Sequence, residues 1–156
     1  MTNKFIYAGF WLRFVAYIID AIAIIISAGV LSVLIPFIDP NFVRFIVAGA
    51  YFIYLESSQY QATLGKMALG LKVTDLNGKR IIPSVAVIRF IGKIISGVIF
   101  FIGFIMAAFT DKKQALHDII ASTLVVQSAS LQAVEIKTES QTDGEVKIVD
   151  LPVIAQ

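Results

Sequence analysis

The chain has 156 residues, of which 58% are hydrophobic and 15% are charged, and its net charge is only +2. A soluble domain usually has about 45–50% apolar and about 25% charged residues, so this composition predicts an integral membrane protein with one compact membrane domain. The small net charge gives no reason to expect a nucleic-acid partner. The lack of cysteine excludes disulfides, thiolate metal sites and cysteine nucleophiles.

The first predicted span runs from Phe10 to Ile35, which provides the ~20 apolar residues that a membrane helix needs. It is too long for the ~7–15 apolar residues of a signal peptide and has no clear cleavage site, so we expect it to be retained. Two charges interrupt it. Arg13 lies close enough to the helix end for its side chain to reach water, whereas the shorter Asp20 should face the bundle interior or a wet cavity.

The second predicted span covers residues 42–60. A short turn separates the two spans, so they should form an antiparallel hairpin. Glu56 lies near the end of the second span, on the same side of the membrane as Arg13. This placement predicts an ion pair between Arg13 and Glu56.

The loop over residues 61–84 has four basic residues and one acidic residue. The positive-inside rule therefore places this loop, and with it the N-terminus, in the cytoplasm. The runs LKVTD and KRII flank Asn77-Gly78, which is a strong signal for a β-hairpin.

The same loop contains TLGK, which invites comparison with a phosphate-binding loop. The comparison fails, because Tyr60 stands at the position of the first glycine and Met67 follows Lys66 where serine or threonine is needed. We instead expect Gly65 and Gly70 at turns or close-packing positions.

The third apolar region, residues 85–109, is compatible with two topologies. Arg89 and Lys93 lie four residues apart on one helix face. The region is either an interfacial helix followed by a short span, or a broken or re-entrant pair that returns the chain to the cytoplasm. Lys112 and Lys113 favour the return, although about 25 residues cannot form two full spans of ~17 residues or more.

The chain after this region changes character. His117 is the single histidine, so its neighbour Asp118 lacks the further ligands of a metal site, and we expect the pair to anchor a loop. The segment ASTLVVQ reads as a short strand. Residues 128–156 are predicted to be a polar tail, either disordered or a β-hairpin around Asp143-Gly144.

Together these segments predict a membrane all-α fold. It would be a small helical bundle of three spans, or of four membrane segments if one is broken or re-entrant. Short β-hairpin elements would lie at the cytoplasmic face and in the C-terminal tail. Residues 1–127 would form the membrane domain and residues 128–156 the tail.

The order and spacing of these residues resemble the RDD family of small bacterial membrane proteins, named for one arginine and two aspartates. Arg13 matches the arginine, Asp20 the first aspartate and Asp118 the second. The loop QATLGKMALGLKVTDLNGK is similar to the family loop, which reads T-x-GK-x-x-x-G-x-x-V before a DG or NG turn. Here Thr63, Gly65, Lys66 and Gly70 occupy its positions, although no glycine precedes the threonine as it often does in the family.

The resemblance covers Tyr7 to Val126 and implies a multi-pass protein of the bacterial inner membrane, for which transport of an unknown ligand has been proposed. One hypothesis is therefore transport, such as cation/proton exchange, in which Asp20 carries the ion and Arg13 adjusts its pKa. The alternative is a non-catalytic scaffold or accessory subunit, in which Arg13, Asp20 and Asp118 clamp a cytoplasmic cap to the helices.

We expect neither enzymatic activity nor a bound cofactor, because the sequence offers no metal cluster and no nucleophile–base pair. The expected partners are the lipid bilayer and either a second copy of the chain or another membrane subunit. The transport hypothesis adds a small cation or a proton.

Overall fold

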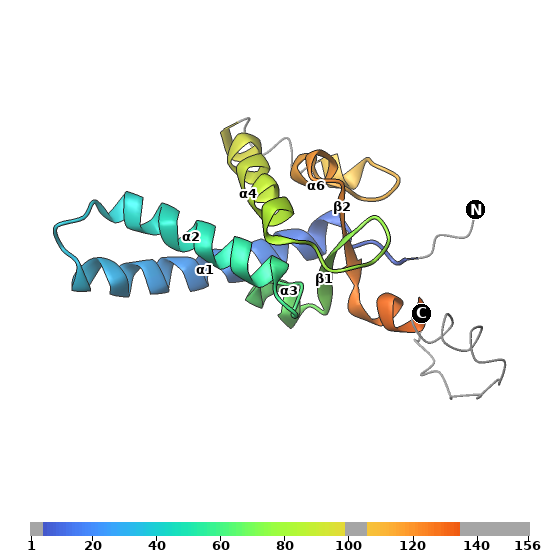
Figure 1. Ribbon diagram of the computed structural model, residues 1–156, viewed down its shortest axis with the longest axis horizontal. Coiled ribbons are helices and arrows are strands. Elements are labelled where there is room, and N and C mark those ends of the chain that lie inside the picture. Colours follow the sequence, from blue (N-terminus) through green and yellow to red (C-terminus); the bar gives the residue numbers. More distant parts are fainter. Residues whose placement is uncertain (1–4, 99–105, 135–156) are drawn as a thin grey trace.

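The structure is a computed structural model that describes residues 5–98 and 106–134. Helices make up most of this part of the chain, and its two strands pair in a small sheet. In chain order the elements are α1 (Phe10–Leu34), α2 (Pro40–Ser57), α3 (Leu64–Ala68), β1 (Leu71–Asp75), α4 (Pro83–Val98), the 3-10 helix η1 (Met106–Ala108), α6 (Leu116–Ile120) and β2 (Thr123–Gln127). Figure 1 shows a long hairpin of α1 and α2 whose turn projects away from the short elements.

The antiparallel hairpin of α1 and α2 confirms the pairing expected of the first two apolar segments. Asp39 begins α2, because its Oδ1 accepts hydrogen bonds from the N–H groups of Asn41 and Phe42 at 2.9 and 3.0 Å. Pro40 follows in the first turn, where a missing N–H costs no helical hydrogen bond. A short, well-capped turn therefore reverses the chain.

α1 is apolar on almost every face. Its buried residues form one narrow stripe at every fourth position: Ala16, Asp20, Ile24 and Ala28. Large apolar side chains cover the remaining faces, and Val33, for example, is 80% exposed. Within the described ranges, α1 is the one helix long and apolar enough to cross a membrane. One clear candidate membrane helix is therefore present, and the predicted three spans are not confirmed.

The two strands join segments that are far apart in the sequence. β1 pairs antiparallel with β2, in a register that sets Leu71 opposite Gln127 and Asp75 opposite Thr123. The segment before α1 extends the pairing, because Ala8 N–H donates to Val125 O at 2.8 Å. Predicted strands at LKVTD and TLVVQ are thus both confirmed.

The predicted hairpin of LKVTD with KRII is wrong. The turn itself forms, with Gly78 at a φ of +87° and Asp75 N–H donating to Lys79 O at 2.9 Å. The residues after it, however, run directly into α4, which begins at Pro83. Ile81 is buried in the core beside the sheet instead of pairing along β1.

α4 and α6 pack against each other, so the chain comes back to α4 after leaving its end. Their approach is close: a Cβ on Gly92 would lie 2.8 Å from Cβ of His117. The contact between α4 and α6 is what the predicted return requires, and the side of the membrane on which α6 lies stays a prediction. Residues 99–105, which link α4 to η1, lie outside the described ranges.

The predicted C-terminal tail begins with a helix. Residues 128–134 are helical, and Leu131 is buried with Phe5, Leu124 and Val126 in a cluster on one side of the sheet. These residues are therefore neither disordered nor part of a hairpin. The predicted hairpin around Asp143-Gly144 lies outside the described residues.

Candidate functional site

The three residues of the arginine–aspartate pattern occupy two separate buried sites. Arg13 of α1 and Asp118 of α6 form an ion pair through Nη1 and Oδ2. Asp118 is fully buried and also accepts from Arg89 Nη1 of α4 at 2.5 Å. Arg89 Nη1 donates as well to the hydroxyl of Thr123 on β2.

Glu56 at the end of α2 is the second shared carboxylate. It is fully buried, and its Oε1 lies 2.5 Å from Lys66 Nζ and 2.7 Å from Lys93 Nζ. Its Oε2 accepts from Arg89 Nε at 2.9 Å. Arg89 thus connects Glu56 to Asp118, because the planar guanidinium presents donors on two edges.

The predicted Arg13–Glu56 ion pair is wrong. Both residues are at the expected end of the hairpin, but Arg89 of α4 pairs with Glu56, and Asp118 of α6 pairs with Arg13. Arg13 Nε instead donates to Ala8 O at 2.9 Å, which directs its remaining nitrogens toward Asp118. The clamp hypothesis groups Arg13 with Asp118 and Asp20, and the structure brings Arg13 to Asp118 while Asp20 lies in a separate site.

Asp20 lies in the second site, where it is 1% exposed and accepts three hydrogen bonds. The donors are the hydroxyl groups of Tyr51 and Thr63, at 2.7 and 2.6 Å, and the backbone N–H of Gly65, at 2.7 Å. Asp20 therefore faces the protein interior, as predicted. Its bonds join α1 to α2 and to the start of α3.

The TLGK loop serves this packing, and three of its residues have direct roles. Thr63 and Gly65 bind Asp20, and Lys66 binds Glu56. Only glycine fits at position 65, because a Cβ there would lie 2.1 Å from Ala16 O of α1. Gly70 has a φ of +64° and joins the loop to β1, as the predicted turn position requires.

His117 lies beside the charged network but does not carry a charge at neutral pH. Burial lowers the pKa of His117 to about 3, and the nearby Asp118 carboxylate offsets this only in part. His117 is therefore neutral at pH 7, and the 3.4 Å from its Nε2 to Asp118 Oδ1 does not join two charges. Burial alone would raise the pKa of Asp118, but Arg13 and Arg89 outweigh it and hold that pKa well below its usual range.

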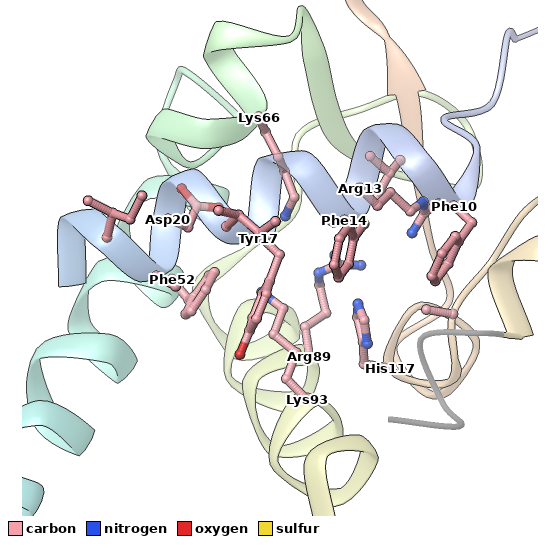
Figure 2. A pocket seen from close by; sticks show the side chains of 15 residues that line it. Phe10, Arg13, Phe14, Tyr17, Asp20, Phe52, Lys66, Arg89, Lys93 and His117 are labelled. Atoms are coloured by element: carbon pink, nitrogen blue, oxygen red, sulfur yellow. The ribbon is translucent and has the colours of Figure 1, made fainter. Parts of the chain in front are cut away.

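A cavity of about 540 Å³ lies beside the network. Four cationic side chains reach its lining, those of Arg13, Lys66, Arg89 and Lys93, and Asp20 is the acidic residue among the lining groups. Figure 2 shows the charged ends of Lys66, Arg89 and Lys93 directed toward the same region. The rest of the lining is His117 and apolar or aromatic side chains: Phe10, Phe14, Tyr17, Ile18, Ala21, Ile22, Phe52, Ala115 and Val125.

Two central members of the site, Arg89 and Lys93, were not among the predicted site residues. The signal was present, because two basic residues four apart in an apolar segment must share one face and need partners. Tyr51 and Thr123 gave no such signal, since a lone tyrosine or threonine in an apolar segment is common. No group of three or more potential metal ligands occurs among residues 5–98 and 106–134.

The chain is similar to one family of proteins and to several of its bacterial relatives. The chain matches the sequence model of the RDD family over residues 7–122. It is similar to three proteins of Bacillus subtilis (strain 168). The uncharacterized protein YxaI is 35% identical over 76% of this chain and 96% of its own length. The uncharacterized membrane protein YteJ is 33% identical over 77% of this chain and 80% of its own length. The uncharacterized protein YckC is 30% identical over 76% and 83%. No solved structure is significantly similar to the chain.

Proposed function

The chain belongs to the RDD family, and we propose that it is a multi-pass membrane protein without catalytic activity, in which buried ion pairs hold a compact cap on a membrane-embedded hairpin. The cap consists of α3, β1, α6 and β2. Such a protein would act as a scaffold or accessory subunit. Its exposed apolar faces would contact lipid and either a second copy of the chain or another membrane subunit.

Placement in the membrane is supported by α1 and by a relative. α1 has 25 residues, which corresponds to a rise of about 37 Å, against a hydrocarbon thickness of about 30 Å. Its large apolar side chains are mostly exposed in the isolated chain. The related YteJ is named a membrane protein. The basic residues of the cap favour its position, and that of the N-terminus, on the cytoplasmic side of the inner membrane.

The scaffold proposal is supported most by the number of elements that the network of ion pairs connects. Five elements contribute charged side chains to it, since Arg13 belongs to α1, Glu56 to α2, Lys66 to α3, Arg89 to α4 and Asp118 to α6. Each of the two carboxylates binds more than one cation. Such a network holds the cap in one position on the helices, because removing one carboxylate would leave cations buried without a partner.

Cation/proton exchange is the second candidate function. Asp20 favours it, because this carboxylate is buried in the candidate membrane helix and borders the cavity. Its three hydrogen-bond donors weigh against it, since they occupy the oxygens that a cation would need. The four cationic residues around the same cavity would also repel a cation.

Proteoliposomes with an internal pH dye test both candidates on the same preparation. For the scaffold, we expect wild-type vesicles under Na⁺ or K⁺ gradients to match empty vesicles. We further expect Asp118→Asn to lower the free energy of unfolding in detergent by about 3–5 kcal/mol, because it leaves Arg13 and Arg89 short of a partner.

Asp111→Asn is the matched control, since Asp111 is exposed and its replacement should change stability by less than about 0.5 kcal/mol. Ion-dependent pH changes in wild-type vesicles that disappear in Asp20→Asn would establish exchange and refute the scaffold proposal. Equal stability of Asp118→Asn and Asp111→Asn would refute the clamp.

A further inference from the structure

The charged network contains more cations than anions. Its four cations are Arg13, Lys66, Arg89 and Lys93, and the carboxylates paired with them are those of Glu56 and Asp118. With His117 neutral, each cation still contacts a carboxylate, but the four cations exceed the two carboxylates by two formal charges. Asp20 lowers this excess without removing it, and its oxygens already accept three hydrogen bonds.

Donor atoms remain unused at the same place. Nη2 of Arg13 and Nη2 of Arg89 are buried and have no hydrogen-bond partner in the described part of the chain. The Arg89 side chain is 0% exposed. Lys66 and Lys93 each bind a single carboxylate oxygen and keep further N–H groups. All four side chains contribute to the cavity wall, although its accessible surface is almost entirely apolar. An anion there would therefore lie close to positive charges from α1, α3 and α4, and would reach the buried Nη2 atoms only when the arginine side chains turn.

Part of the cavity lining is formed by apolar side chains of α1 that are also exposed at the surface. Phe14, Ile18 and Ile22 line the cavity and are 46%, 44% and 54% exposed. They belong to α1, the candidate membrane span. The cavity therefore lies between the buried cationic network and a surface that suits hydrocarbon chains. A small hydrophilic anion would use the first feature and not the second.

We propose that this cavity binds the phosphate headgroup of an anionic membrane lipid, with an acyl chain along Phe14, Ile18 and Ile22. Arginine and lysine side chains together bind phosphate oxygens well, and basic pockets between membrane helices on the cytoplasmic side bind anionic headgroups. The lipid supplies the negative charge that the network lacks. This site does not depend on whether the protein is a scaffold or an exchanger.

Native mass spectrometry of the full chain in detergent tests the proposal, with phosphatidylglycerol and phosphatidylcholine of equal chain length as competing probes. We expect a preference for phosphatidylglycerol of about tenfold or more. Lys93→Gln should weaken phosphatidylglycerol binding about fivefold, the size expected for one lost lipid-facing charge. Arg44→Gln is the matched control, because Arg44 is exposed at the far end of α2 and does not line this cavity.

A second variant leaves every charge in place. Ile18→Trp narrows the apolar side of the cavity, and we expect it to reduce phosphatidylglycerol binding severalfold while thermal stability is kept. Ile25→Trp is its control, since Ile25 is 57% exposed on α1 and lies outside the lining. This pair keeps the test valid even if Lys93→Gln unfolds the network.

Three results would overturn the proposal. Equal binding of the two lipids would show that the cavity does not select an anionic headgroup. An equal loss for Lys93→Gln and Arg44→Gln, together with no loss for Ile18→Trp, would show attraction to the general surface charge. Displacement of phosphatidylglycerol by millimolar inorganic phosphate, with Ile18→Trp unaffected, would assign the site to a free anion and not to a lipid.

Discussion

Arg89 is the residue on which the buried network depends most. Its Nε binds Glu56 and its Nη1 binds Asp118, so a single side chain joins two carboxylates from α2 and α6. A lysine could not bridge both at these positions, because its charge is one compact group and not a planar fork. Burying so many charges is costly, and it is tolerated only where each ion has close partners. Position 89 is therefore constrained by geometry as well as by charge.

The buried His117 should make the stability of the folded chain depend on pH. Its pKa is about 3 in the folded chain and near 6.5 when unfolded, so between these values the unfolded state binds the extra proton. Stability should therefore be fully present above pH 6.5 and fall as the pH is lowered, by up to about 1.4 kcal/mol per pH unit. Thermal or denaturant unfolding in detergent between pH 7.5 and 4.5 measures this slope.

Between pH 6.5 and 4.5 the slope of stability against pH is due to His117. The chain has one histidine, and the unfolded carboxylates titrate mainly below about pH 4.5. His117→Gln is the control, since glutamine does not titrate and keeps a similar size. It should flatten the slope in this window. An unchanged slope in His117→Gln would show that another group is responsible.

How much of the site could be predicted differs from residue to residue. The burial of Asp20 followed from the sequence, because a short carboxylate inside an apolar span cannot reach water. The partner of Arg13 did not follow, since Glu56 and Asp118 were both available and only the position of α4 decides between them. The cost of exposing a carboxylate to lipid depends on that residue and its own helix. The choice of an ion-pair partner depends on how the helices pack.

At the scale of elements, local patterns predicted the strands and missed their pairing. The alternation of apolar and polar residues in LKVTD and the short run of apolar, mostly β-branched residues in TLVVQ are properties of each segment, and both are strands. Asn77-Gly78 favours a pairing across the turn, but Pro83 begins a helix before a second strand can form. β2 then pairs with β1 from a distant part of the sequence. Strand pairing is a contact between segments, and neither segment specifies it alone.

A glycine pair tests the packing of α3 on α1. Gly65→Ala would place a Cβ 2.1 Å from the backbone oxygen of Ala16, so α3 must move away and the bond from Gly65 N–H to Asp20 must lengthen. We expect a loss of about 3 kcal/mol in the free energy of unfolding. Gly29→Ala is the control, since nothing lies within 4 Å of its Cβ. It should be neutral or stabilising by up to about 1 kcal/mol.

Equilibrium unfolding in mixed micelles measures both variants under the same conditions. A loss in Gly65→Ala that is no greater than the change in Gly29→Ala would contradict the close contact of α3 with α1. A loss shared by Gly65→Ala and Asp20→Asn, but not additive in the double variant, would agree with one joint contact.

At the scale of the whole molecule, the contacts place the start of α1 beside the cap. Ala8 bonds to Val125 of β2, and Arg13 pairs with Asp118 of α6. The turn of the hairpin, around Phe37, projects in the opposite direction (Figure 1). If α1 crosses the bilayer, the cap and this turn must therefore lie on opposite sides, and everything bonded to the cap must lie on one side.

Single-cysteine labelling tests this topology, because the chain contains no cysteine of its own. Phe37 is 83% exposed at the hairpin turn, so Phe37→Cys should react with a membrane-impermeant maleimide in intact cells. Lys79→Cys, in the exposed turn after β1, should react only after the cells are permeabilised, since the basic cap is expected in the cytoplasm.

Lys112→Cys distinguishes the two topologies that the sequence left open for residues 85–109. We expect it to react like Lys79→Cys. Lys113, the next residue in the sequence, lies beside the start of α1, because a Cβ on Gly9 would be 4.0 Å from its Nζ. Labelling of Lys112→Cys from outside, with Lys79→Cys protected, would require a complete span after Lys93. Asp118 would then lie across the bilayer from Arg13, and the ion pair between them could not form.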